Sequence, residues 1–231
     1  MKFRTTALAF AVLAFASTGG CRQEQPGAAN ATQSSGAPAP AEAAARHAAF
    51  LAAAMPFKAL AEQAQTANDA TLKALIGAAR KAADGVSTKL DASKDVILRQ
   101  QLKAIDAARA SGERTDLALG AAECFRILAS EAPDNGRVPV AVNLLDYAGF
   151  RYRAALSASP ARWSNAEGAI RFAQRQWAGL SGQVADPDLR NAVIASLDDM
   201  HNASTSHDAA AGRKAANRAL DLIDRLGANL H

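Results

Sequence analysis

The chain has 231 residues, and its 26 lysines and arginines against 22 aspartates and glutamates give a formal net charge of +4. Half of that excess comes from Lys2 and Arg4 in the first twenty residues, so the rest of the chain is close to neutral. No basic cluster interleaved with aromatic residues accompanies this charge, which excludes the usual nucleic-acid-binding surface. The residues from 46 onward are enough for one domain with a sizeable core or for two small bundles.

The chain starts with the pattern of a secretory signal. Lys2 and Arg4 form a short basic start, and an apolar run from Thr6 to Ala16 follows them. A run of this length is typical of the apolar part of a signal peptide, and it is too short to cross a bilayer as a helix. We therefore expect a signal peptide over residues 1–20 and an exported protein.

A cysteine with small residues in front of it closes this signal. The segment Thr18-Gly19-Gly20-Cys21 resembles the lipobox of bacterial lipoproteins, in which the cysteine sulfur is acylated before the signal is cut. The resemblance implies that Cys21 is lipidated and anchors the mature chain to a membrane. The alternative is ordinary cleavage after Ala16, which would release a soluble protein with Cys21 as a free thiol.

Residues 21–45 have the composition of a flexible tether, because Pro, Gly, Ala, Ser and Gln dominate them. Lipoproteins kept in the inner membrane favour an aspartate directly after the cysteine, whereas this chain has Arg22. The resemblance therefore implies a periplasm-facing anchor in the outer rather than the inner membrane. We expect the partners to be the membrane, through the lipid, and other envelope proteins.

Residues 46–231 favour helix throughout. Alanine is abundant, aromatic residues make up only 5% of the chain, and runs of β-branched residues are absent. Apolar residues recur at alternating steps of three and four, which predicts an all-α fold, an antiparallel bundle of six or seven helices. The expected helices span about 57–82, 89–110, 115–131, 138–156, 163–184, 189–200 and 216–230. A break near Asp134 leaves open whether this is one bundle or two halves, 46–134 and 135–231.

A polar stripe marks the helix expected over residues 138–156. Asn143, Asp146 and Arg153 recur on one side of a helix that is otherwise largely apolar. We expect them to form interhelical ion pairs with Glu167 and Arg171 on the next helix, as a buried polar cluster that fixes the register. The alternative is a pocket, which would suit an anionic or aromatic ligand.

A second polar group lies at residues 198–208. Asp198 and His201 share one face of a helix, and with Met200 and His207 they would suit a metal such as copper in an exported protein. Met55 with His201 could instead ligate haem non-covalently, because no Cys-x-x-Cys-His motif is present. We favour the simpler interpretation, in which the helix ends near His201 and both imidazoles are solvated.

No catalytic motif accompanies these groups. Cys124 follows the apolar positions of its helix and is expected to be a buried, unreactive thiol. The chain has neither a Gly-x-Ser-x-Gly elbow nor a glycine-rich phosphate loop. We therefore expect an envelope lipoprotein that acts as a binding or interaction module, with no cofactor and no chemistry of its own. The alternative is a periplasmic metal- or haem-binding bundle that uses His201.

Overall fold

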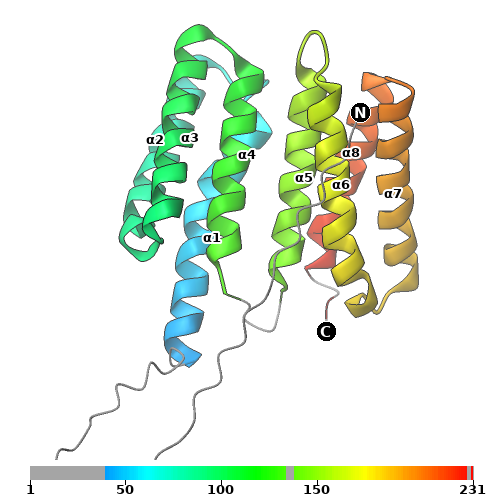
Figure 1. Ribbon diagram of the computed structural model, residues 1–231, viewed down its shortest axis with the longest axis horizontal. Helices are drawn as coiled ribbons and strands as arrows, with labels where there is room; N and C mark the ends of the chain where they lie inside the picture. Colours follow the sequence, from blue (N-terminus) through cyan, green and yellow to red (C-terminus); the bar gives the residue numbers. More distant parts are fainter. Residues whose placement is uncertain (1–39, 134–137, 228–229, 231) are drawn as a thin grey trace, which may run out of the picture. The chain divides into compact units, whose positions relative to one another are not determined.

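A computed structural model describes residues 40–133, 138–227 and 230 (Figure 1). Helices make up nearly all of these residues, and none of them belongs to a β-strand, which confirms the predicted all-α bundle. None of the described helices combines the length and the apolar character that a bilayer crossing requires. The helices are α1 (Pro40–Gln63), α2 (Asp69–Val86), α3 (Ala92–Ser111), α4 (Arg114–Glu131), α5 (Val140–Ser157), α6 (Trp163–Leu180), α7 (Pro187–Thr205) and α8 (Ala209–Leu226).

The helices pack as two sets of four that share one boundary. In the first set α1 packs on α2 and α4, and α4 packs on α3; in the second, α5 packs on α6 and α8, and α7 packs on both of these. The two sets meet where α4 packs on α5. Each set has its own apolar core, but Tyr147 and Phe150 of α5 and Leu220 of α8 belong to the core of the first set. Helix α5 is therefore common to both cores.

The long first helix predicted over 57–82 is wrong, because two helices occupy this range. Helix α1 ends at Gln63, and Asn68 starts α2 by accepting a hydrogen bond from the backbone N–H of Thr71 at 2.9 Å. The alanine-rich apolar pattern continues through the break and hides it, so the described helices number eight and not six or seven. Helix α1 also begins at Pro40, so residues 40–45 are helical and not part of a tether.

The predicted end of the helix at His201 is also wrong. Helix α7 continues to Thr205, and the chain turns at His207, whose φ of 53° is left-handed. Asp208 then caps α8 by accepting hydrogen bonds from two backbone N–H groups. Helices α5 and α6, which follow each other in the chain, pack together as expected for neighbours in an antiparallel bundle.

Two glycines let α5 and α8 approach closely. A Cβ atom on Gly149 would lie 2.7 Å from Leu220 Cδ2, and one on Gly212 would lie 2.5 Å from Leu156 Cδ1 and 2.7 Å from Tyr152 Oη. Tyr152 is held in place, since its hydroxyl donates to the carbonyl of Met200 at 2.8 Å. The interface of α5 with α8 therefore has no room for even a methyl group at these positions.

We predict that Gly212→Ala lowers the free energy of unfolding by about 1–3 kcal/mol, because the added methyl group must displace Leu156 and Tyr152. The control is Gly168→Ala on α6, where a Cβ would meet nothing within 4 Å. Removal of a glycine from that helix is expected to stabilise the protein by about 0.5–1 kcal/mol. Urea unfolding followed by circular dichroism measures both, and a Gly212→Ala protein as stable as the parent would contradict the prediction.

Candidate functional site

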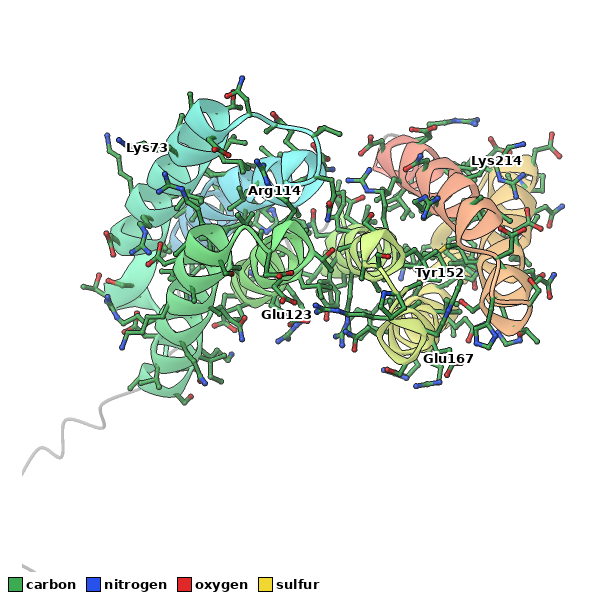
Figure 2. The ribbon with its side chains drawn as sticks, turned by 90° about the horizontal axis from the view of Figure 1, so that it is seen from above. Lys73, Arg114, Glu123, Tyr152, Glu167 and Lys214 are labelled. Atoms are coloured by element: carbon green, nitrogen blue, oxygen red, sulfur yellow. The ribbon has the colours of Figure 1, made fainter. Side chains whose placement is uncertain are left out.

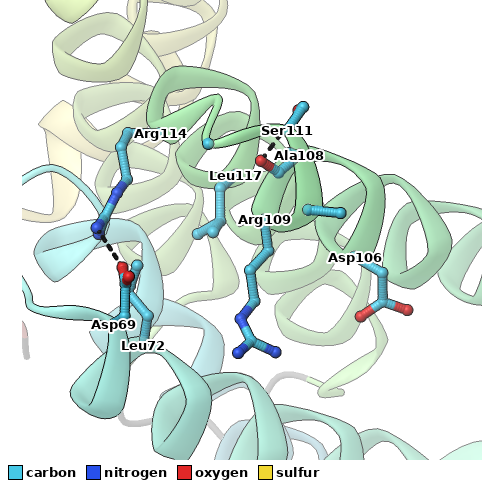
Figure 3. Close-up of a pocket in the computed structure, with 10 residues that line it drawn as sticks. Asp69, Leu72, Asp106, Ala108, Arg109, Ser111, Arg114 and Leu117 are labelled. Carbon is cyan, nitrogen blue, oxygen red and sulfur yellow. Dashed lines mark hydrogen bonds and ion pairs between the residues drawn. The ribbon is translucent and has the colours of Figure 1, made fainter.

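A groove of about 850 Å³ opens where the start of α2, the end of α3 and the start of α4 meet (Figure 3). A volume of this size lies within the range of small-molecule binding sites. The groove is bounded by the first turn of α2, the last turn of α3 and the first turn of α4. Its lining residues are Asp69, Leu72, Asp106, Ala108, Arg109, Ala110, Ser111, Gly112, Arg114 and Leu117.

The local sequence explains why a groove forms here. Helices α2 and α3 are joined across their gap by an ion pair between Arg80 and Asp106, and the groove lies at the open end beyond it. Gly112 ends α3 in a left-handed conformation, with φ of 76°, which glycine adopts without a steric penalty. Its N–H donates back to the carbonyl of Arg109 at 3.2 Å, and the chain turns at once into α4. The end of α3 and the start of α4 therefore face the same space.

Arg114 holds one wall of the groove in place. Its Nη1 donates to the carbonyls of Ala64 and Ala67, at 3.2 and 2.8 Å, and its Nη2 lies 2.8 Å from the carboxylate of Asp69. It thereby satisfies carbonyl groups at the end of α1 and pairs with the first residue of α2. Arg114 is thus already engaged by protein groups.

The second arginine of the groove, Arg109, lacks contacts of this kind. Its side chain projects from α3 into the space between α3 and α2, as Figure 3 shows. The described part of the chain offers its guanidinium no ion pair and no hydrogen bond. Leu72 and Leu117 lie beneath the groove and are 2% and 1% exposed, so they provide a packed base and little free apolar surface. The groove therefore presents an exposed arginine above two buried leucines.

Comparison with protein-family models, with curated proteins and with solved structures finds no match for this chain. The interpretation of the site therefore depends on its own geometry.

The predicted polar cluster is centred on Asp146, which is buried between the two helix sets. Lys58 of α1 donates to Asp146 Oδ2 at 2.8 Å and to Asp224 of α8 at 3.3 Å, while Asp146 Oδ1 has no hydrogen-bond partner. Burial raises the pKa of Asp146 to about 6, an effect that Lys58 opposes and that the charges of Asp224 and Glu62 reinforce. Burial disfavours the charged form of Lys58, yet the two aspartates outweigh it and raise the pKa of the ammonium.

A second polar cluster lies where α4 meets α5. Glu123 accepts hydrogen bonds from the hydroxyl of Tyr147 at 2.5 Å, from Arg151 at 3.0 Å and, through its other oxygen, from Arg126 at 2.9 Å. Burial and the neighbouring Glu123 carboxylate raise the pKa of Tyr147 to about 12. The phenol therefore stays protonated and acts as a hydrogen-bond donor at this boundary.

The polar stripe on α5, Asn143, Asp146 and Arg153, does make contacts between helices, but the partners predicted for it, Glu167 and Arg171, are wrong. Glu167 and Arg171 pair with each other at 3.5 Å on the exposed side of α6, where Figure 2 shows Glu167 pointing outward. Arg153 reaches the Glu62 carbonyl of α1 and Asn217 of α8, both at 3.4 Å, and Asn143 is half-buried. The stripe on α5 thus faces α1 and α8 and not α6.

Sequence reasoning missed Lys58 and Glu123 as the counter-charges of these clusters. A signal for Lys58 was present, since it is the only aspartate, glutamate, lysine or arginine between Arg46 and Glu62 in an otherwise apolar stretch of helix. Such an isolated charge within a core-forming helix indicates a buried partner elsewhere. Glu123 carries no comparable signal, because its helix presents charges at several positions.

The predicted metal and haem ligands are not brought together. Asp198, His201 and His207 are exposed and Met200 is buried, and the described residues contain no group of three or more His, Cys, Asp or Glu side chains that could hold a metal ion. The ring of His207 instead lies edge-on to Trp163, with centroids 4.9 Å apart. Met55 is exposed on α1, which packs on α2 and α4, whereas His201 is on α7.

Of the two cysteines, the structure describes Cys124. Cys124 is fully buried, as predicted, and burial together with the charge of Glu123 raises the pKa of its thiol far above the ordinary value. It is therefore not a nucleophile in this fold. Cys21, the predicted lipidation site, lies outside the described residues.

We predict that Asp146 makes the protein more stable in mild acid. The pKa of Asp146 in the folded protein is above its unfolded value. The contribution of this carboxyl group to the free energy of unfolding is therefore fully present below about pH 4 and is lost as the pH rises through about 6. Between pH 7.5 and 5 the group should add about 1 kcal/mol to the free energy of unfolding. Asp146→Asn removes this term.

The free energy of unfolding in urea is measured for the parent and for Asp146→Asn at both pH values. The readout is the change in this free energy between the two pH values, compared between the two proteins. Asp198→Asn is the matched control, because Asp198 is exposed and should leave the pH dependence unchanged. Identical pH dependence in the parent and in Asp146→Asn would show that Asp146 does not titrate in this range.

Proposed function

We propose that this chain is a lipid-anchored protein of the bacterial cell envelope whose helical domain is a non-catalytic binding module. The observation that carries the binding role is the groove between α2, α3 and α4. It has the volume of a ligand site, and its Arg109 has no ion pair or hydrogen bond to any of the described residues. The two carboxylates in its lining, Asp69 and Asp106, are both paired with arginines and are not poised for acid–base chemistry.

An exposed apolar surface supports the proposal less well than the groove. The large apolar side chains exposed in the described residues are Met55, Val96, Ile97 and Ile194. They are distributed over α1, α3 and α7, and single exposed apolar residues are common on soluble proteins. The groove is therefore the better candidate for the surface that meets a ligand or another envelope protein.

The anchor is supported by the sequence pattern Thr18-Gly19-Gly20-Cys21. A tether of the composition seen between Cys21 and the start of α1 at Pro40 would have a root-mean-square length on the order of 25 Å. The domain would then search a thin layer of periplasm next to the membrane, with the outer membrane favoured by Arg22. Its partners would be molecules that reach that layer.

We predict that Cys21→Ser moves the protein out of the membrane fraction. The full-length chain, expressed with its own signal in a Gram-negative bacterium, should appear in membranes with an intact mass that starts at Cys21 and includes acyl groups. Cys124→Ala is the matched cysteine control and should stay in the membranes, because Cys124 lies in the core of the domain. An unmodified mass that starts at Ser17 would overturn the anchor.

A further inference from the structure

We propose that the groove binds an oxyanion, the carboxylate or phosphate group of a small ligand, with Arg109 as its main contact. This inference deepens the proposed binding function and rests on it. It assigns a chemical class to the ligand and a residue to its recognition.

The charged side chains around the groove form ion pairs with one another, except for Arg109. Arg114 pairs with Asp69, and Asp106 pairs across the gap with Arg80 of α2. Asp106 precedes Arg109 by three residues and would be its natural partner on the same helix, but its carboxylate is occupied by Arg80. Two aspartates and two arginines line the groove, and Arg109 is the one of these four that has no ion pair among the described residues.

The acid that follows Arg109 in the chain, Glu113, does not pair with it either. Glu113 follows Arg109 by four residues, which on a continuous helix would place the two side chains together. The left-handed turn at Gly112 ends α3 between them, and no ion pair joins Glu113 to Arg109 in the part of the chain that the structure describes. Neither of these two acids forms an ion pair with Arg109 in the described residues, and the exposed guanidinium of Arg109 points into the groove (Figure 3).

A guanidinium in this position is suited to an oxyanion. Arg presents five N–H donors in a planar fork, which matches the oxygens of a carboxylate or a phosphate. Asp69 is 90% exposed and contacts a single nitrogen of Arg114, so it can rotate away and let a ligand share that second guanidinium. The hydroxyl of Ser111 lines the same space but donates to the carbonyls of Ala107 and Ala108, at 3.0 and 3.2 Å, so the two arginines are the donors for the ligand.

The test uses the full chain labelled with ¹⁵N and titrated at constant ionic strength with sodium benzoate, with inorganic phosphate and with sodium chloride. The readouts are the Nε–Hε signal of Arg109 and the backbone amides of Ser111 and Gly112. We expect a saturable shift of these signals with benzoate, with phosphate or with both, and the lower dissociation constant identifies the ligand as a carboxylate or a phosphate compound.

Arg109→Gln should weaken this binding by about tenfold or more, because it removes a charged hydrogen-bonding group. Lys103→Gln is the matched control, since Lys103 is exposed on the same helix and does not line the groove. Shifts that stay linear, or that chloride reproduces, mean an adventitious ion only and overturn the proposal. Saturable shifts confined to another surface overturn the groove as the site but leave the binding role standing.

Discussion

The position of α5 between the two helix sets depends on the polar contacts of Asp146, a carboxyl group that is buried against Lys58. A carboxylate buried this deeply costs several kcal/mol unless a counter-charge reaches it, and Lys58 offsets only part of this cost, since the pKa of Asp146 stays raised to about 6. The pair fixes α5 against α1, and Asp224 extends the contact to α8. With Glu123 holding α4 to α5 on another face, α5 is tied in register to helices of both sets.

The two sets of four helices differ in how they close. In the second set α6 packs on α7 and completes the ring, whereas α2 and α3 hardly meet along their backbones and are joined by the Arg80–Asp106 pair. Beyond this pair they leave the groove open. Buried apolar residues of α2 and α3 still belong to the common core of the first set, so the groove lies above a packed base.

The sequence predicts the fold well and the site poorly, for identifiable reasons. Helical periodicity is a local property, so the class of fold and the pairing of α5 with α6 follow from it, while the break at Asn68 disappears in an uninterrupted apolar pattern. Asp146 could be recognised as part of a polar cluster, but its partner Lys58 lies 88 residues away in the chain. Arg109 became a candidate only once the structure placed it in a groove with no ion pair to a described residue.

The shared role of α5 has a consequence for how this protein can be divided or recombined. A cut between Pro133 and Val138 separates the two helix sets on paper, but Tyr147, Phe150 and Leu220 would leave the core that they fill. The edge-to-face contact of Phe125 with Phe150, with centroids 6.0 Å apart, would be lost as well. A fragment of the first set alone would therefore expose apolar core surface that Tyr147, Phe150 and Leu220 cover in the whole chain.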